Sequence, residues 1–290
     1  QLTSFLLITA TVIIPSQAEL IPGNHRFTFQ DGSGKAIPVF YTLPERSNPQ
    51  TPIILVMHGA SRTAERYRNE WAAYAQEFKF ILAAPHFSKT DFPGKRGYIL
   101  GNQVDADGNP IPKPQWAFSA INPLFKAIKL ETANNSENFR MYGHSGGCQF
   151  LHRYLYAYPR APVDAAVCAN AGWYTLPDLH TPYPYGLQDR GISRESLSSL
   201  FARRFIVLLG DQDTDSQHPS LNRARLTLQQ GPHRFARGHH FYQRAVLTST
   251  EQKLSLNWSL AIAPGVGHNN KGMARLAAPM LLNGPINIYD

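Results

Sequence analysis

The sequence predicts an α/β protein built on a doubly wound, mostly parallel sheet, and two observations carry that prediction. Short, almost continuously apolar runs recur along the chain, and segments with a helical pattern separate them. Continuous apolar character is typical of strands that are buried on both faces, as in a parallel sheet. Alternation of strand and helix then places helices on both faces of that sheet. The apolar runs are residues 53–57, 80–84, 139–142, 165–169, 205–209 and 258–263.

The chain ahead of the first buried run predicts an N-terminal antiparallel hairpin at the edge of the sheet. Residues 25–30 and 36–42 have strand character, and Asp31-Gly32-Ser33-Gly34 between them supplies turn residues. Helical patterns follow further along the chain, and the one that ends before Pro159 is the clearest because its apolar side chains share one face. These patterns cover residues 63–78, 118–131, 146–158 and about 234–253.

Two long segments fit no helix or strand. Residues 85–115 are rich in Gly, Pro and Asp and follow a buried strand, and residues 178–193 follow the strand that contains Cys168. Long connections at the carboxyl edge of a parallel sheet usually shape a pocket. We therefore expect both segments to be loop insertions that border the functional site.

Length and composition favour a single globular domain over residues 19–290, preceded by a signal peptide. The chain has 290 residues, of which 43% are hydrophobic and 17% charged, enough to bury one large core. An apolar run over residues 5–14 precedes small residues at Ser16 and Ala18, which predicts a cleaved secretory signal, truncated because the sequence opens at Gln1 without a basic leader. We expect a secreted or periplasmic protein, with no stable membrane span after this segment.

The balance of basic and acidic residues does not by itself exclude any class of function. Lys and Arg number 28 against 20 Asp and Glu, but the basic residues are scattered and show no recognition-helix or aromatic-platform pattern. We expect these basic residues to lie on solvated surfaces, and we expect no nucleic-acid partner. The oligomeric state is left open.

The two cysteines, Cys148 and Cys168, are too few for a disulfide scaffold and lack metal-site spacing. Two buried free thiols are the expectation, with a bond between them as the alternative.

The most informative motif is Gly143-His144-Ser145-Gly146-Gly147, which lies between the strand at 139–142 and a helical pattern. This is the G-x-S-x-G pattern of a nucleophile elbow, in which glycines permit a sharp strand-to-helix turn that exposes the serine. Ser145 is the candidate nucleophile. A glycine-rich turn without chemistry is the alternative, so the motif needs partners elsewhere in the chain.

A base and an acid follow Ser145 in the order that such a site requires. The loop after the run at 258–263 contains His268, which is the favoured base. The loop after the run at 205–209 reads Gly210-Asp211-Gln212-Asp213-Thr214-Asp215. Asp213 is the favoured acid and Asp215 its main rival, while Asp211 is expected to cap the turn.

An oxyanion site completes the expected machinery. The run at 53–57 is followed by His58-Gly59-Ala60, in the loop that normally supplies the second backbone donor. The backbone N–H groups of Ala60 and Gly146 are therefore the predicted pair. His58 is expected to brace this loop.

Together these motifs resemble the α/β-hydrolase superfamily, and most closely its poly(3-hydroxybutyrate) depolymerase-like serine esterases. The resemblance runs from about residue 53 to 270. It implies a metal-free, usually secreted hydrolase, with Ser145 as nucleophile, Asp213 as acid, His268 as base, and Ala60 with Gly146 as oxyanion donors. Separate substrate-binding domains of extracellular polymer degraders are missing from the sequence, and Cys148 is not part of the general motif.

We expect a serine esterase that cleaves small or oligomeric carboxylic esters through an acyl-enzyme. A peptidase or amidase with the same triad is an alternative, and so is a catalytically silent binding protein. Aromatic residues that could hold the acyl group or a ring are Trp173, which follows a strand end directly, and also Tyr174, Tyr67 and Trp116.

No cofactor or metal is expected. Two segments begin like a calcium loop, one at Asp211 and one at Asp105. Ser216 and Pro110 stand where the calcium loop requires glycine, and neither segment supplies the distal glutamate.

Overall fold

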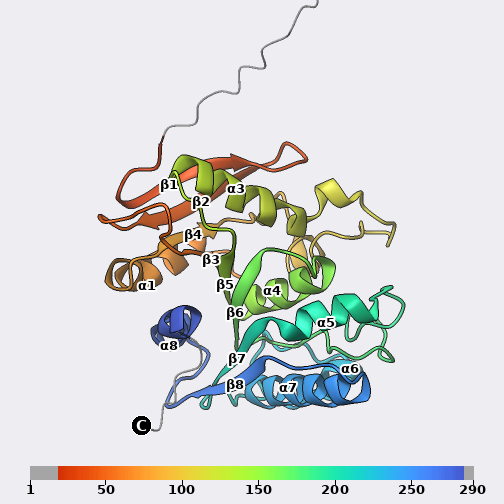
Figure 1. The fold of residues 1–290 in the computed structure, drawn as a ribbon. Coiled ribbons are helices and arrows are strands. Elements are labelled where there is room, and N and C mark those ends of the chain that lie inside the picture. Colours follow the sequence, from red (N-terminus) through yellow and green to blue (C-terminus); the bar gives the residue numbers. More distant parts are fainter. Residues whose placement is uncertain (1–18, 284–290) are drawn as a thin grey trace, which may run out of the picture.

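The computed structural model describes residues 19–283 and contains one eight-stranded sheet (Figure 1). The expected signal segment, residues 1–18, lies outside the described residues. The strands are β1 (Gly23–Gln30), β2 (Ala36–Leu43), β3 (Ile53–Met57), β4 (Ile81–Pro85), β5 (Phe139–His144), β6 (Val163–Ala169), β7 (Arg204–Gly210) and β8 (Trp258–Ala263). Their order in the sheet is β1-β2-β4-β3-β5-β6-β7-β8.

The sheet has the predicted mixed character. Strands β1 and β2 form an antiparallel hairpin whose inner strand pairs with β4, and every pairing from β4 through β8 is parallel. The parallel strands β3 and β4 are buried at every position, which explains why their sequences are continuously apolar. The predicted fold class, α/β and doubly wound with an N-terminal hairpin, is confirmed.

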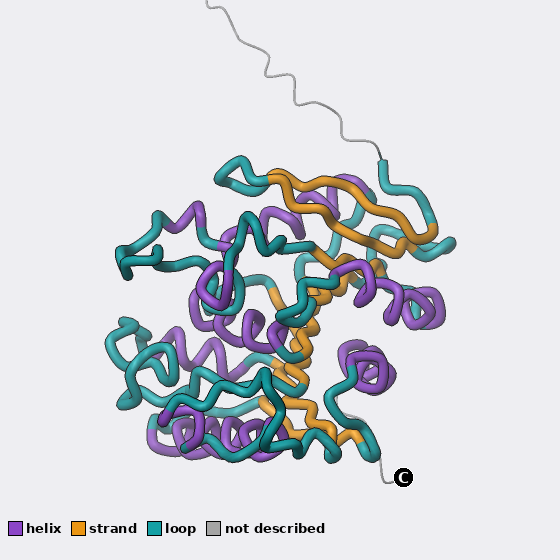
Figure 2. Tube along the Cα trace, turned by 180° about the vertical axis from the view of Figure 1, so that it is seen from behind, coloured by secondary structure: helices purple, strands orange, loops and turns teal. Residues whose placement is uncertain are grey.

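Helices cover both faces of the sheet (Figures 1 and 2). Helices α1 and α8 pack on one face, while α3, α4, α5 and α7 contribute to the core on the other. The helices are α1 (Ala64–Glu77), α2 (Gly94–Gly97), α3 (Ile121–Glu131), α4 (Gly146–Ala157), α5 (Arg194–Ala202), α6 (Arg225–Leu228), α7 (Arg234–Glu251) and α8 (Asn270–Asn283), with short 3₁₀ turns η1 (Lys113–Gln115) and η2 (Ala117–Ala120). No described helix is both long enough and apolar enough to cross a bilayer.

Several boundaries differ from the sequence-based prediction. The helix expected at 118–131 is two pieces, because η2 has the tighter 3₁₀ geometry before α3 begins at Ile121. The 85–115 segment contains the one-turn helix α2, and α5 was not predicted because its apolar positions are few. These differences leave the strand order, and therefore the location of the strand ends, unchanged.

The expectation of two free thiols is wrong. Cys148 in α4 and Cys168 in β6 form a disulfide, with their Cα atoms 4.6 Å apart. That separation arises because α4 follows β5 directly and packs over β6, the neighbour of β5 in the sheet. The bond ties the helix behind Ser145 to the sheet.

Candidate active site

Ser145 lies at the junction between β5 and α4 in a strained backbone conformation. Its φ of 56° and ψ of −116° fall outside the regions that residues with a side chain normally adopt. Its N–H donates to the carbonyl oxygen of Ala169 at 2.9 Å, and its own carbonyl accepts from the N–H of Gln149 at 3.1 Å. These bonds hold the turn from both sides, so Ser145 remains at the carboxyl edge of the sheet.

The glycines around Ser145 are required by contacts with backbone atoms. A Cβ atom on Gly143 would lie 2.3 Å from the carbonyl oxygen of Gly147, and one on Gly147 would lie 2.0 Å from that of Met57. Neither oxygen belongs to a flexible side chain that could move aside. The G-x-S-x-G pattern is therefore a steric requirement of this turn.

His268 and Asp213 converge on Ser145 from the loops after β8 and β7. The Nε2 atom of His268 lies 3.1 Å from Oγ of Ser145, and its Nδ1 atom lies 2.7 Å from Oδ2 of Asp213. Asp213 is 3% exposed, whereas the His268 side chain is 24% exposed. The three side chains thus form a continuous hydrogen-bonded chain from the buried interior to the surface of the site.

The other aspartates of the β7 loop have partners other than His268. Oδ1 of Asp215 accepts from the N–H of Gln217 at 2.8 Å, and Oδ1 of Asp211 accepts from the N–H of Gly265 at 2.8 Å. Asp215 therefore stabilises its own turn, whereas Asp211 ties this loop to the loop after β8 and does not cap its own turn as expected. Asp213 is the aspartate of this loop that is bonded to His268.

Arg234, the first residue of α7, is a member of the site that the sequence did not single out. Its Nη1 lies 3.3 Å from Oδ1 of Asp213, the oxygen that His268 does not use. Its Nη2 donates to Oγ of Ser220 at 2.6 Å, and the guanidinium is 2% exposed. Arg234 therefore fixes the orientation of Asp213, yet nothing in its local sequence distinguishes it from the neighbouring arginines.

The backbone N–H groups of Ala60 and Gly146 lie side by side next to Ser145. A Cβ atom built on Gly146 would be 2.7 Å from the nitrogen of Ala60, and one built on Gly59 would be 3.8 Å from Cβ of Ser145. No hydrogen bond from either N–H to another described residue is present. Two unpaired donors at this point can stabilise negative charge on a reacting oxygen.

His58 braces the loop that carries Ala60. Its Nδ1 is 2.9 Å from the carbonyl oxygen of Gly59, and its Nε2 accepts from the N–H of Phe87 at 3.2 Å. Complete burial lowers the pKa of His58 to about 3, so the ring is neutral at physiological pH. Both ring nitrogens of His58 are hydrogen-bonded to buried backbone groups. His58 therefore supports the backbone of this loop and does not face the site.

A cavity of about 310 Å³ opens in front of Ser145. Its lining includes four cationic side chains and no Asp or Glu. Arg62 is largely engaged with backbone carbonyls, including those of Phe87 and Gly94, whereas Lys89 and Lys95 are exposed. The lining residues are Ala60, Arg62, Lys89, Gly94, Lys95, Ile99, Ser145, Gln149, Gly172, Trp173, Ser220, Asn222 and Arg234.

The structure separates the aromatic residues that were expected to contact substrate. Trp173 lines the Ser145 cavity. Tyr67 does not, because it is buried beneath the elbow with its hydroxyl 3.1 Å from Nδ1 of His144. Tyr174 is fully buried against Phe241, with ring centroids 4.3 Å apart, and Trp116 lines a different cavity. Residue order alone does not show which way these rings point.

One group of described residues has the composition of a metal site: Cys148, His152 and Cys168. The two sulfur atoms are bonded to each other. Both nitrogens of His152 are also engaged, one with the carbonyl of Cys148 at 2.7 Å and one with the N–H of Thr175 at 3.0 Å. These side chains are already partnered within the protein and do not fit a metal ion.

Comparison with known structures identifies the superfamily. Poly(aspartic acid) hydrolase-1 from Sphingomonas sp. KT-1 aligns with a TM-score of 0.88 and 39% identity, covering 91% of this chain and 100% of that one. LpqC, a poly(3-hydroxybutyrate) depolymerase from Bordetella parapertussis, aligns with a TM-score of 0.86 and 31% identity over 93% of each chain. The chain belongs to the α/β-hydrolase superfamily. It is a depolymerase-like hydrolase.

More distant α/β-hydrolases share the fold alone. An S-formylglutathione hydrolase from Agrobacterium tumefaciens is similar with a TM-score of 0.54 at 13% identity, over 92% of this chain. No family model and no curated protein sequence matches the chain.

Proposed function

We propose that this hydrolase cleaves carboxylic esters through an acyl-enzyme formed on Ser145. The observation that carries the proposal is the unbroken chain of contacts from Ser145 through His268 to Asp213, at 3.1 and 2.7 Å. A serine hydroxyl is a poor nucleophile unless a base within hydrogen-bond reach takes its proton, and that base must itself be oriented. All of these elements lie at one edge of the sheet.

In the proposed reaction, Oγ of Ser145 attacks the acyl carbon while Nε2 of His268 takes its proton. The negative charge that develops on the carbonyl oxygen is stabilised by the N–H groups of Ala60 and Gly146. His268 then donates the proton to the leaving alcohol. Water next attacks the acyl carbon while His268 takes its proton, the bond from the acyl carbon to Oγ of Ser145 breaks, and His268 returns the proton to Oγ as the acid leaves. Asp213 keeps His268 in the required tautomer, and Arg234 keeps Asp213 in place.

The test is hydrolysis of p-nitrophenyl butyrate by Ser145→Ala. We expect the turnover number to fall by about 10⁴-fold or more, because removal of the nucleophile removes the covalent route. Ser61→Ala is the matched control, since Ser61 is exposed and lines neither cavity, and it should stay within about twofold. Unchanged turnover in Ser145→Ala, or failure of a fluorophosphonate to label Ser145, would overturn the mechanism.

A second candidate substrate is an amide bond in an acidic polymer. Two observations favour it: the Ser145 cavity is lined by Arg62, Lys89, Lys95 and Arg234 without a carboxylate, and a 39% identical relative is named a poly(aspartic acid) hydrolase. Cationic lining attracts polyanionic chains and steers their encounter. The same triad can cleave amides when the leaving amine is protonated.

A direct comparison decides between the two substrates. The enzyme would be given poly(aspartate), oligomers of 3-hydroxybutyrate and matched small esters, with product measured by chromatography. If the ester oligomers are hydrolysed faster, the result supports the first proposal. If poly(aspartate) is hydrolysed faster, the result supports the second. In the second case Lys89→Gln/Lys95→Gln should raise KM for poly(aspartate) several-fold and leave KM for p-nitrophenyl acetate unchanged.

We also propose that the protein is exported to the periplasm or secreted. The support is the sequence pattern of residues 1–18, with its apolar run and small residues before position 19. Fusion of this segment, behind an added initiator Met and basic leader, to a reporter that is active only outside the cytoplasm would test it. Retention of the reporter in the cytoplasm would contradict it.

A further inference from the structure

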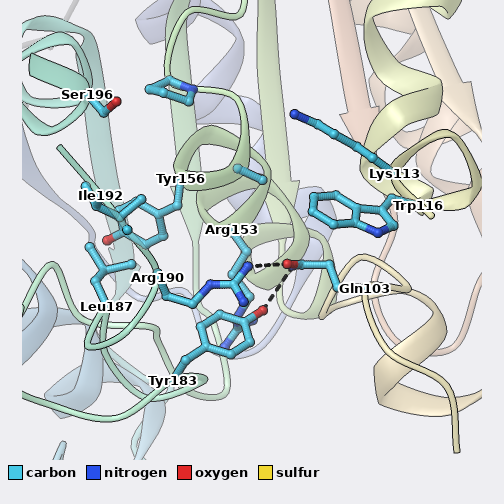
Figure 3. Close-up of a pocket in the computed structure, with 13 residues that line it drawn as sticks. Gln103, Lys113, Trp116, Arg153, Tyr156, Tyr183, Leu187, Arg190, Ile192 and Ser196 are labelled. Atoms are coloured by element: carbon cyan, nitrogen blue, oxygen red, sulfur yellow. Dashed lines mark hydrogen bonds between the residues drawn. The ribbon is translucent and has the colours of Figure 1, made fainter. Parts of the chain in front are cut away.

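A second cavity, of about 250 Å³, lies apart from the Ser145 cavity and shares no lining residue with it. Figure 3 shows Gln103, Lys113 and Trp116 on one side of the cavity and Tyr156, Leu187 and Ile192 on the other. Arg153 of α4 lies between these groups, as do Tyr183 and Arg190 of the 178–193 segment. Both long segments that fit no regular element in the sequence therefore contribute to this cavity.

The cavity is strongly cationic. Lys113, Arg153 and Arg190 line it, and no Asp or Glu does. Within residues 19–283, no carboxylate lies in ion-pair distance of any of these three cations. The cavity thus holds positive charge that the described part of the chain does not neutralise.

Arg153 is the most unusual of the three, because it is 1% exposed and has no acidic partner. Its Nε donates to Oγ1 of Thr175 at 2.8 Å and its Nη1 to the carbonyl of Gln149 at 2.9 Å, but its Nη2 has no hydrogen-bond partner. Burial lowers the pKa of Arg153 to about 10, so the group remains charged at neutral pH. A buried cation without a counter-charge is costly, and an anion in the cavity would offset that cost.

Arg190 and the aromatic walls give the cavity a defined shape. The guanidinium of Arg190 lies 4.3 Å from the centre of the Tyr183 ring and donates to Oε1 of Gln103. Nε2 of Gln103 donates in turn to the Tyr183 hydroxyl at 3.1 Å. Figure 3 shows these bonds and the rings of Tyr156 and Trp116 on opposite sides of them. The cation is held in place beside flat, largely apolar surfaces.

We propose that this second cavity binds an organic carboxylate with a small apolar or aromatic body. Arg190 and Lys113 would donate charge-assisted hydrogen bonds to the carboxylate, and Arg153 would supply the buried counter-charge. The rings would cover the carbon skeleton. The inference depends on the lining residues alone and would stand if Ser145 were not a nucleophile.

Arg153, which lines the second cavity, contacts two residues that line the Ser145 cavity. The guanidinium of Arg153 lies 4.1 Å from the centre of the Trp173 ring, and Trp173 lines the Ser145 cavity. Gln149 also lines the Ser145 cavity, and its carbonyl accepts from Arg153. The carboxylate could therefore come from a free acid or from an acidic group carried on the substrate chain.

Direct binding tests the proposal. Succinate and benzoate would be titrated into the protein by calorimetry, with succinamide as the neutral control and chloride at equal ionic strength. We expect saturable binding of at least one carboxylate, weakened about tenfold in Arg190→Gln through loss of one charge-assisted bond. Lys113→Gln should weaken carboxylate binding as well. The same effect from two separate substitutions would show that the loss is not a local folding defect of one variant. Arg26→Gln is the control, since Arg26 is exposed on β1 and lines neither cavity.

Binding that is absent for both carboxylates, unchanged in both Arg190→Gln and Lys113→Gln, or matched by succinamide or chloride would overturn the proposal. Competition kinetics then separate the two sources of the carboxylate. If succinate competes with poly(aspartate) and Arg190→Gln raises KM for that polymer, the carboxylate belongs to the substrate chain. If succinate binds without competing, it belongs to a free acid. Both results support a carboxylate site.

Discussion

The two cavities on either side of the Trp173–Arg153 pair are alike in charge and differ in chemistry. Each is lined by cations without a carboxylate, and both linings include serine: Ser145 and Ser220 in one, Ser196 in the other. Ser145 is bonded to His268, whereas the Ser196 hydroxyl has only the hydroxyl of Ser193 as a described partner, at 3.0 Å. Positive charge can select an anion, but a reactive serine requires the strained elbow and an oriented base.

The largest expected effect concerns the acid behind His268. We expect Asp213→Asn to reduce the turnover number for p-nitrophenyl butyrate by about 10⁴-fold, because the amide would hold His268 in the wrong tautomer. Asp215→Asn is the matched control and should stay within about twofold, since Asp215 only caps a turn. Steady-state kinetics of the two variants measure this difference. Equal losses in both would show that the β7 loop matters as a whole and that Asp213 has no separate role.

A smaller effect should appear in the pH dependence of stability, because a buried neutral histidine lies next to each cavity. His144 contacts the ring of His268 and His152 lies beside Arg153, and burial lowers the pKa of both well below the usual 6.5. The unfolded chain binds protons at these positions below pH 6.5 while the folded chain does not. Their stabilising contribution is therefore complete above pH 6.5 and declines as the pH falls, by up to about 1.4 kcal/mol per pH unit for each histidine.

Urea unfolding at pH 7.5 and pH 5.5 would measure this decline. His152→Gln should reduce the difference between the two pH values, and His25→Gln, at an exposed position on β1, should leave it unchanged. A free energy of unfolding that is independent of pH over this range would contradict the assignment of these histidines as neutral.

The smallest expected effect is a difference in KM between variants of two tryptophans, Trp173 and Trp116. Trp173 lines the Ser145 cavity and Trp116 the second one. We expect Trp173→Ala to raise KM for p-nitrophenyl butyrate about tenfold through loss of apolar contact, and Trp116→Ala to leave it within about twofold. Thermal melts would confirm that both variants are folded. The reverse pattern would mean that the substrate enters the second cavity.

Much of the fold was predictable because its signals are local. Strands buried on both faces must be continuously apolar, so β3 through β8 were recognisable one at a time. The antiparallel hairpin was predictable from the turn at Asp31-Gly32-Ser33-Gly34. The break between η2 and α3 was not, because 3₁₀ and α geometry place apolar residues at similar spacings.

The candidate site was predictable where chain order determines position. Ser145, Asp213 and His268 each follow a parallel strand, and the carboxyl ends of β5, β7 and β8 meet at one edge of the sheet. The structure brings these residues together, and their catalytic roles remain the proposal made above. Tyr174 also follows a strand, β6, while Tyr67 lies in α1 and Trp116 between η1 and η2, yet none of the three lines the Ser145 cavity.

The sequence by itself determined the fold class, the elbow and the order of its partners, because each depends on residue types at short spacings. Only the tertiary structure decided that Cys148 and Cys168 are bonded, that Arg234 orients Asp213, and that Arg153 and Arg190 share a cavity. Those relations join side chains from separate segments. Their meeting depends on how helices and loops pack against the sheet, and no local pattern of residues carries that information.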